Sequence, residues 1–225
     1  IRWLVYERRV LDMARLLEAL RNNFEGFELE RQYCLAAPKF GNQDDRVDDI
    51  AARLDRFMVE FCGRHLNYYG GTPEIFYVPV TSHRAMGGVT GATPDGRRAG
   101  DALSAGISPG AGCARNGFTA ILHSVAACKY EQGLARAAPM PPRAVAGKDG
   151  CARMAAFVRT WSRQKHWHLN ICMQDALQLL AARNDKEKFY AQMMPFEGYA
   201  ALPGPLRPEV QAELLRDALE QDIQA

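Results

Sequence analysis

Apolar residues recur at the three-to-four-residue spacing of helices in several segments of the chain. A first helix is predicted to begin after Asp12, a side chain suited to an N-cap, and to end by Gly26. A second helix is predicted from Asp45 to Gly63. Its apolar positions share one face: Val47, Ile50, Leu54, Phe57, Met58 and Phe61. Each of these helices therefore has one side suited to burial.

Further helices are predicted downstream from the same periodicity. Residues 119–128 form an apolar run typical of a buried helix, and residues 147–164 form an amphipathic one. Four side chains of the latter are predicted to point inward: Met154, Phe157, Val158 and Trp161. The pattern also indicates a helix over 175–183 and a last one opened by Pro208 in its first turn.

Strands are predicted where the apolar spacing changes. Residues 166–172 alternate with period two, residues 75–80 are β-branched and aromatic, and residues 189–196 lead directly to Gly198. Between these lies a long stretch, 82–117, which is rich in Gly, Pro, Ser and Asp and is predicted to be a functional loop. Strands that alternate with helices favour an α/β protein.

Composition narrows the class of protein without naming it. The 225 residues are 48% hydrophobic and 24% charged, and the net charge of +2 gives no reason to expect nucleic acid or an anionic membrane as partner. No apolar run approaches the roughly 20 residues that span a bilayer. The six cysteines form no CxxC pair, which favours reduced thiols in a cytoplasmic protein. The start at Ile1 looks internal to a longer chain.

Four motif-bearing segments follow one another along the chain. Residues 36–48 contain APKFGN followed by three aspartates, and residues 90–101 read TGATPDGRRAGD. Residues 105–122 contain AGISP and NGFTAIL, and residues 187–199 contain EKFY and then Gly-Tyr. In this order the segments closely resemble the motifs of glycyl radical enzymes, the family of pyruvate formate-lyase and of the glycerol and propanediol dehydratases. The resemblance extends from about Leu16 to Leu219.

The resemblance implies a fold that periodicity alone does not. The family has a ten-stranded α/β barrel made of two half-barrels and surrounded by helices, with a glycine loop inside. This chain is expected to supply the C-terminal part of such a barrel. The expected division places the end of a pyruvate formate-lyase-like domain in residues 1–97 and a glycine-radical domain in residues 98–225.

The resemblance also implies that Gly198 stores a radical, with Glu197, Tyr199 and Ala200 as neighbours in its loop. Glycine suits this task because its Cα has no side chain, so a carbon that has lost one hydrogen can flatten between its amide and carbonyl groups. In the family the hydrogen is removed by a separate radical activating enzyme that uses S-adenosylmethionine and an iron–sulfur cluster. The expected cofactor is therefore the protein-derived glycyl radical itself.

The family passes its radical to a cysteine in a Gly-Cys-x-Glu loop, and that cysteine then attacks a small-molecule substrate. Cys113 and Cys151 follow glycines here, but no acid follows them at the required position. The chain alone is therefore expected to be inactive and to need the N-terminal part of the barrel. At full length it is expected to be an oxygen-sensitive, cytoplasmic homodimer of anaerobic metabolism, with lyase, dehydratase or formate C-acetyltransferase activity.

Two departures from the radical motif keep other functions open. Pro195 stands where the family has arginine, and Ala200 where it has serine. The first alternative is a non-catalytic spare-part subunit that supplies an intact glycine loop to a damaged partner. The second is a degenerate paralogue that keeps the fold without the radical.

Two further constellations are weaker. His166, His168 and Cys172 share one face of a predicted strand and could bind zinc, but no fourth ligand is evident. Polar residues that face a barrel interior or a neighbouring strand are the favoured interpretation, so no metal site is expected. Arg97 and Arg98 could bind a phosphate or carboxylate. In a Pro-Asp-Gly turn, however, internally paired or solvated arginines are the favoured interpretation.

Overall fold

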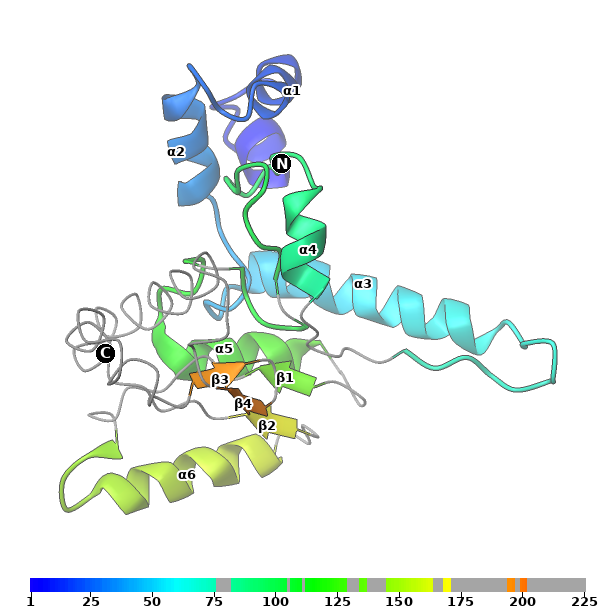
Figure 1. The fold of residues 1–225 in the computed structure, drawn as a ribbon, viewed down its shortest axis with the longest axis vertical. Coiled ribbons are helices and arrows are strands. Elements are labelled where there is room, and N and C mark those ends of the chain that lie inside the picture. The colour runs from blue at the N-terminus through cyan, green and yellow to red at the C-terminus, as the bar shows by residue number, and fades with distance from the viewer. Residues whose placement is uncertain are drawn as a thin grey trace.

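The computed structural model describes residues 1–75, 82–104, 106–110, 112–128, 134–136, 145–163, 168–170, 194–196 and 199–201. The helices are η1 (Arg2–Glu7, a π-helix), α1 (Met13–Arg21), α2 (Glu28–Ala36), α3 (Asp45–Gly63), α4 (Ser82–Gly88), α5 (Gly117–Ala127) and α6 (Gly150–Arg163). The strands are β1 (Leu134–Arg136), β2 (His168–Asn170), β3 (Met194–Phe196) and β4 (Tyr199–Ala201). Figure 1 shows η1, α1 and α2 at one end, α5 and α6 toward the other, and α3 projecting sideways.

The N-terminal helices enclose a small core of their own. Its buried members are Leu4, Leu11, Leu16, Ala19, Phe24 and Cys34. The predicted first helix is confirmed, because the carboxylate of Asp12 accepts the N–H of Arg15 at 2.7 Å as an N-cap. The helix ends at Arg21, earlier than Gly26, which has φ +74° and lies at the end of the following turn. Helix α2 was not predicted, since its sequence is mostly polar and Cys34 is its one fully buried side chain among those described.

A second core joins α5 to α6. It is formed by Ile107, Ile121, Leu122, Val125 and Trp161. Both helices were predicted within a few residues of their observed ends, and Trp161 is buried as expected. Val158 is the exception: it is 45% exposed, so its predicted inward orientation is wrong.

The described strands form two small sheets. In one, β1 pairs with β2 in parallel, with Ala135 opposite Leu169. In the other, β3 pairs with β4 in antiparallel. The predicted strands over 166–172 and 189–196 are confirmed in their described parts. The strand predicted over 75–80 and the helices predicted over 175–183 and after Pro208 lie outside the described residues, apart from Ile75, which is not in a strand.

The predicted long loop over 82–117 is wrong at its start, where Ser82–Gly88 forms α4. Seven residues that end in two glycines are too short to show helical periodicity. The helix is tied to the following segment by the N–H of Leu103, which donates to the carbonyl of His83 at 3.1 Å. Among the described helices, none is both long and apolar enough to cross a membrane.

Candidate active-site scaffold and radical loop

Strands β3 and β4 bring together the chain on the two sides of Gly198. Their register places Phe196 opposite Tyr199 and Pro195 opposite Ala200. Glu197 and Gly198 lie outside the described residues. Of the predicted site residues, Tyr199 and Ala200 are therefore placed in β4, beside the strand that precedes the glycine.

Asn42 joins two motif segments that are far apart in sequence. Its amide group donates to the carbonyl of Lys39 at 3.0 Å and to that of Cys113 at 2.8 Å. Its side-chain oxygen accepts the N–H groups of Arg115 at 2.6 Å and Asn116 at 3.2 Å. The side chain of Asn116 returns a bond to the carbonyl of Asn42 at 2.9 Å. Hydrogen bonds thus connect the APKFGN segment to the residues that immediately precede α5.

Two motif glycines let segments that are far apart in sequence approach one another closely. Gly41, at φ +91°, lies against Pro109, and a Cβ added to Gly41 would come within 2.2 Å of the proline ring. Gly96, at φ +100°, lies against Leu35, where an added Cβ would come within 2.7 Å of the side chain. Arg31 reaches the same place and donates to the carbonyl of Gly96 at 3.0 Å. Both positions need glycine for its backbone freedom and for its small size.

Arg97 organises the TGATPDGRRAGD loop from within. Its guanidinium donates to the hydroxyl of Thr93 at 3.2 Å and to the carbonyls of Thr90 at 3.3 Å, Arg98 at 3.0 Å and Asp101 at 2.6 Å. A further bond reaches the carbonyl of Gly91. This five-partner arrangement confirms the internally paired interpretation for Arg97 and leaves it no N–H for an external anion.

Lys39 caps the C-terminal end of α2. Its ammonium donates to three main-chain carbonyls, those of Cys34, Leu35 and Ala37. These are carbonyls at the end of a helix, where a cation is favourable. Burial is the main cause that lowers the pKa of the Lys39 ammonium. Burial likewise raises the pKa of the Cys34 thiol, so Cys34 is kept as an unreactive thiol.

A buried polar pair connects α3 to α5. The hydroxyl of Ser124 donates to one carboxylate oxygen of Asp48 at 2.8 Å and accepts the N–H of Gln43 at 3.0 Å. The second oxygen of Asp48 is buried and has no hydrogen-bond partner. Desolvation is the main cause that raises the pKa of Asp48.

The alternative metal site is not testable on the described residues, because of its three ligands only His168, in β2, is placed. The part of the chain that the structure describes contains no group of three side chains able to hold a metal ion. Five cysteines lie in the described part of the chain, and none of them is in a disulfide: Cys34, Cys62, Cys113, Cys128 and Cys151.

Comparison with known proteins identifies the class of protein to which the chain is similar. A family model described as pyruvate formate lyase-like matches residues 1–87, and one described as glycine radical matches residues 103–203. The chain is 39% identical over 220 residues to an isethionate sulfite-lyase of Nitratidesulfovibrio vulgaris, covering 96% of this chain and 27% of the relative. It is 30% identical to the trans-4-hydroxy-L-proline dehydratase of Clostridioides difficile, over 96% of this chain and 28% of the relative.

Solved structures agree with the sequence relatives. The hydroxyproline dehydratase of Clostridioides difficile superposes with a TM-score of 0.85 at 28% identity, over 96% of this chain and 28% of that one. A propanediol-dehydrating protein from Roseburia inulinivorans gives 0.85 at 29% identity, over 96% of this chain and 29% of that one. The chain belongs to the glycyl radical enzyme family. These neighbours support the predicted α/β barrel. The chain spans little more than a quarter of the length of these relatives.

Sequence reasoning identified the motif segments but not the residues that hold them together. Asn42, Lys39 and Ser124 had no assigned role. Asn42 and Lys39 lie inside the APKFGN motif, and a polar Ser124 in an apolar helix was a signal for a buried partner.

Proposed function

We propose that this chain is the radical-storing part of a glycyl radical enzyme, with the radical on the Cα of Gly198. The observation that carries the proposal is that Gly198 falls within the segment matched by the glycine radical family, between two strands that pair with each other. Such pairing supports a loop whose two ends are fixed, while the glycine between them is presented first to the activating enzyme and then to the cysteine.

The proposed chemistry is two hydrogen-atom transfers. In the first, one Cα–H bond of Gly198 is broken and the hydrogen atom passes to a radical that the activating enzyme generates from S-adenosylmethionine. In the second, the glycyl radical takes a hydrogen atom from a cysteine thiol, which restores the C–H bond and leaves a thiyl radical for the substrate. None of the six cysteines here lies in a Gly-Cys-x-Glu sequence, so we propose that this thiol belongs to the rest of the barrel.

The relatives favour an elimination over an acyl transfer. Identity reaches 39% over 96% of the chain with an isethionate sulfite-lyase, against 32% over 88% with formate acetyltransferase 1 of Escherichia coli. We therefore place the reaction among carbon–sulfur or carbon–oxygen lyases acting on a small molecule. The proposed functional division keeps residues 98–225 as the glycine-radical domain, within the later half of a ten-stranded barrel that is a homodimer when complete.

The test is electron paramagnetic resonance after anaerobic treatment with the activating enzyme of an isethionate sulfite-lyase relative. The expected result is a doublet that is lost in Gly198→Ala and retained in Gly147→Ala, a positive-φ glycine around which an added Cβ meets nothing within 4 Å. Oxygen should then cut the chain at Gly198, as read by mass spectrometry. Absence of both signals, under conditions that activate the relative, would favour the degenerate paralogue, a reading that Pro195 and Ala200 support.

A further inference from the structure

Asn116 and Gly117 form the one Asn-Gly step of the chain. The side-chain amide of an asparagine can be attacked by the main-chain nitrogen of the next residue, which closes a five-membered succinimide ring and releases ammonia. Glycine in the second position favours this attack, because it has no Cβ to crowd the nitrogen. The sequence therefore marks Asn116 as a position where the backbone of the protein is itself a nucleophile.

The folded structure holds Asn116 away from the reactive geometry. Ring closure requires Cβ and the nitrogen of Gly117 to lie on the same side of the Cα–C bond, which corresponds to a ψ of about −120° at a tetrahedral Cα. The observed φ and ψ of Asn116 are −102° and 19°. The main chain is thus about 140° of rotation away from the geometry in which the reacting atoms meet.

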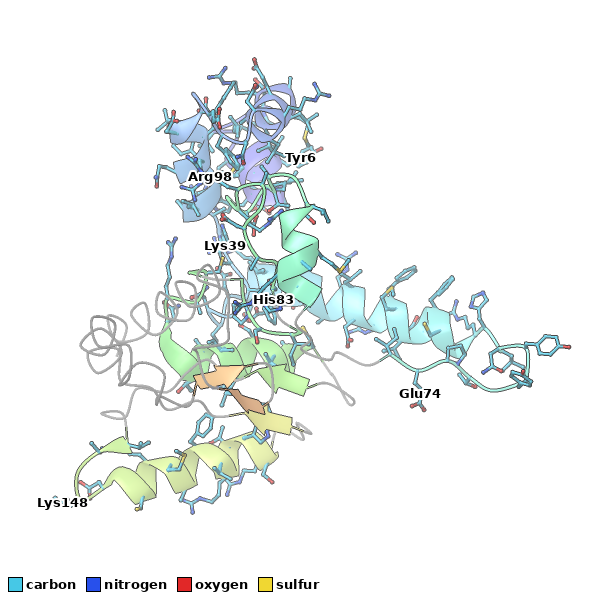
Figure 2. The ribbon with its side chains drawn as sticks, in the orientation of Figure 1. Tyr6, Lys39, Glu74, His83, Arg98 and Lys148 are labelled. Atoms are coloured by element: carbon cyan, nitrogen blue, oxygen red, sulfur yellow. The ribbon has the colours of Figure 1, made fainter. Side chains whose placement is uncertain are left out.

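Asn42 holds this conformation from the other motif segment. Its side-chain oxygen accepts the N–H of Asn116 at 3.2 Å, and its carbonyl accepts the side-chain amide of Asn116 at 2.9 Å. In Figure 2, Lys39 marks the stretch of chain that leads to Asn42, between the end of α2 and the start of α3. Both the main chain and the side chain of Asn116 are therefore bound to one residue, 74 positions away in sequence.

Helix α5 adds a second restraint on the same rotation. If the bonds to Asn42 stay intact, a change of ψ at Asn116 must swing α5 away from α3. The buried bond between Ser124 and Asp48, at 2.8 Å, opposes that movement. Ring closure therefore requires a local opening that releases Asn116 from Asn42.

Water reaches this position, so burial does not prevent the reaction. Asn116 is exposed and Gly117 is half-buried. Water is the only co-reactant that the chemistry needs. The conformation held by Asn42 is therefore what limits the reaction.

We propose that Asn116 is a site of spontaneous deamidation that Asn42 keeps closed. After a local opening, the nitrogen of Gly117 forms a bond to Cγ of Asn116 and the bond from Cγ to Nδ2 breaks. The N–H proton of Gly117 is relayed by water and leaves with the ammonia. Water then opens the ring at one of its two carbonyls and leaves either an aspartyl residue or an isoaspartyl residue, whose main chain runs through Cγ. The inference does not depend on whether Gly198 carries a radical.

The product is unable to restore the connection between the two motif segments. The amide that donated to the carbonyl of Asn42 is replaced by a carboxylate oxygen, and two acceptors do not bond to each other. An isoaspartyl residue also adds a methylene to the main chain directly before α5. One opening event therefore separates the APKFGN segment from α5 permanently, and the altered fraction of the protein grows with its age.

Peptide mass spectrometry after incubation in heavy-oxygen water measures the reaction, because each hydrolysed ring takes up one labelled oxygen. Asn116 should react at least about tenfold more slowly in the folded protein than in the same chain in urea. Asn42→Ala should raise the rate in the folded protein at least about fivefold. Arg97→Lys is the matched control, since it destabilises a different loop, and it should change the rate by less than about twofold. Both variants are compared at a temperature at which they are folded.

A second variant introduces the product directly. Asn116→Asp should lower the urea midpoint below that of Asn116→Ala, because its carboxylate faces the carbonyl of Asn42. Asn67→Asp is the control, since the Asn67 side-chain oxygen accepts the N–H groups of Tyr69 and Gly71 and a carboxylate keeps that role. Its midpoint should stay close to that of the parent.

Four results would overturn the proposal. Asn116 reacts as fast in the folded protein as in urea, or it stays unreacted in urea. Arg97→Lys accelerates the reaction as much as Asn42→Ala does. The urea midpoint of Asn116→Asp equals or exceeds that of Asn116→Ala, a comparison that decides even if Asn42→Ala fails to fold.

Discussion

The side-chain oxygen of Asn42 accepts the N–H of Arg115 at 2.6 Å, across 73 positions of the chain. The same side chain holds the carbonyl of Cys113, so one amide group secures both ends of that segment. This contact makes the two motifs one structural unit.

Asn42→Ala should therefore destabilise the chain by about 2–4 kcal/mol, because it removes several hydrogen bonds and leaves their main-chain partners unsatisfied. Asn116→Ala removes the bond from the Asn116 side chain to the carbonyl of Asn42 and should cost about 1 kcal/mol. Urea unfolding of the two variants measures the difference. Equal losses would contradict the central position of Asn42.

Gly41→Ala tests the close approach to Pro109. Both Gly41 and Gly26 have positive φ, but an added Cβ meets nothing within 4 Å at Gly26 and the ring of Pro109 at Gly41. Gly26→Ala should cost about 1–2 kcal/mol for its backbone conformation alone. Gly41→Ala should cost about 1–3 kcal/mol more, because the segments must move apart. Thermal and urea unfolding measure the two losses, which should be equal if the contact with Pro109 is absent.

Arg97→Lys should fail to replace arginine, although it keeps the positive charge. A single ammonium has three donors and no planar fork, and therefore leaves several of the five oxygen partners of Arg97 unpaired. The expected loss is about 2–4 kcal/mol. The neighbouring Arg98→Lys is the control and should stay within about 0.5 kcal/mol. Protection of the loop amides in hydrogen exchange provides the second measurement.

Asp48 should make stability depend on pH in the sense opposite to that of most carboxylates. Burial raises its pKa in the folded state above the value of the unfolded chain. Its favourable contribution is therefore complete below the unfolded pKa and is lost as the pH rises through the folded pKa. Asp48→Asn, which stays neutral, should thus gain stability relative to the parent as the pH rises from about 4 to 7. Unfolding titrations across that range measure the difference. A gap that narrows with rising pH contradicts the assignment.

The sequence predicted the helices whose signals are local. The N-cap of Asp12, the spacing of apolar residues in α3 and the apolar run of α5 all lie within one element. Helix α2 was missed because it has no side-chain cap and few buried residues, and α4 because it is short. The apolar face predicted for α3 is exposed in the described part of the protein, with Ile50, Leu54, Phe57 and Phe61 at 45–61%. Its burial depends on what lies beside the helix, which no pattern within the helix records.

The motif segments were recognised, but the interactions that unite them were not predictable. Asn42 and Arg97 bind main-chain oxygens and N–H groups, which every part of the chain offers, so residue types do not identify the partners. The contact of Asn42 with Cys113 spans 71 positions and is decided by tertiary structure alone. The roles of Gly198 and its neighbours remain predictions from resemblance.

The commitment of Arg97 to its own main chain affects how mutagenesis of this region is to be interpreted. A survey of substitutions would rank Arg97 among the most sensitive positions, and its guanidinium invites assignment to the binding of an anion. The loss would instead reflect disruption of the loop that the hydrogen bonds of Arg97 hold together. Arg97 is therefore not a candidate for binding an external anion, because its guanidinium is fully used within its own loop.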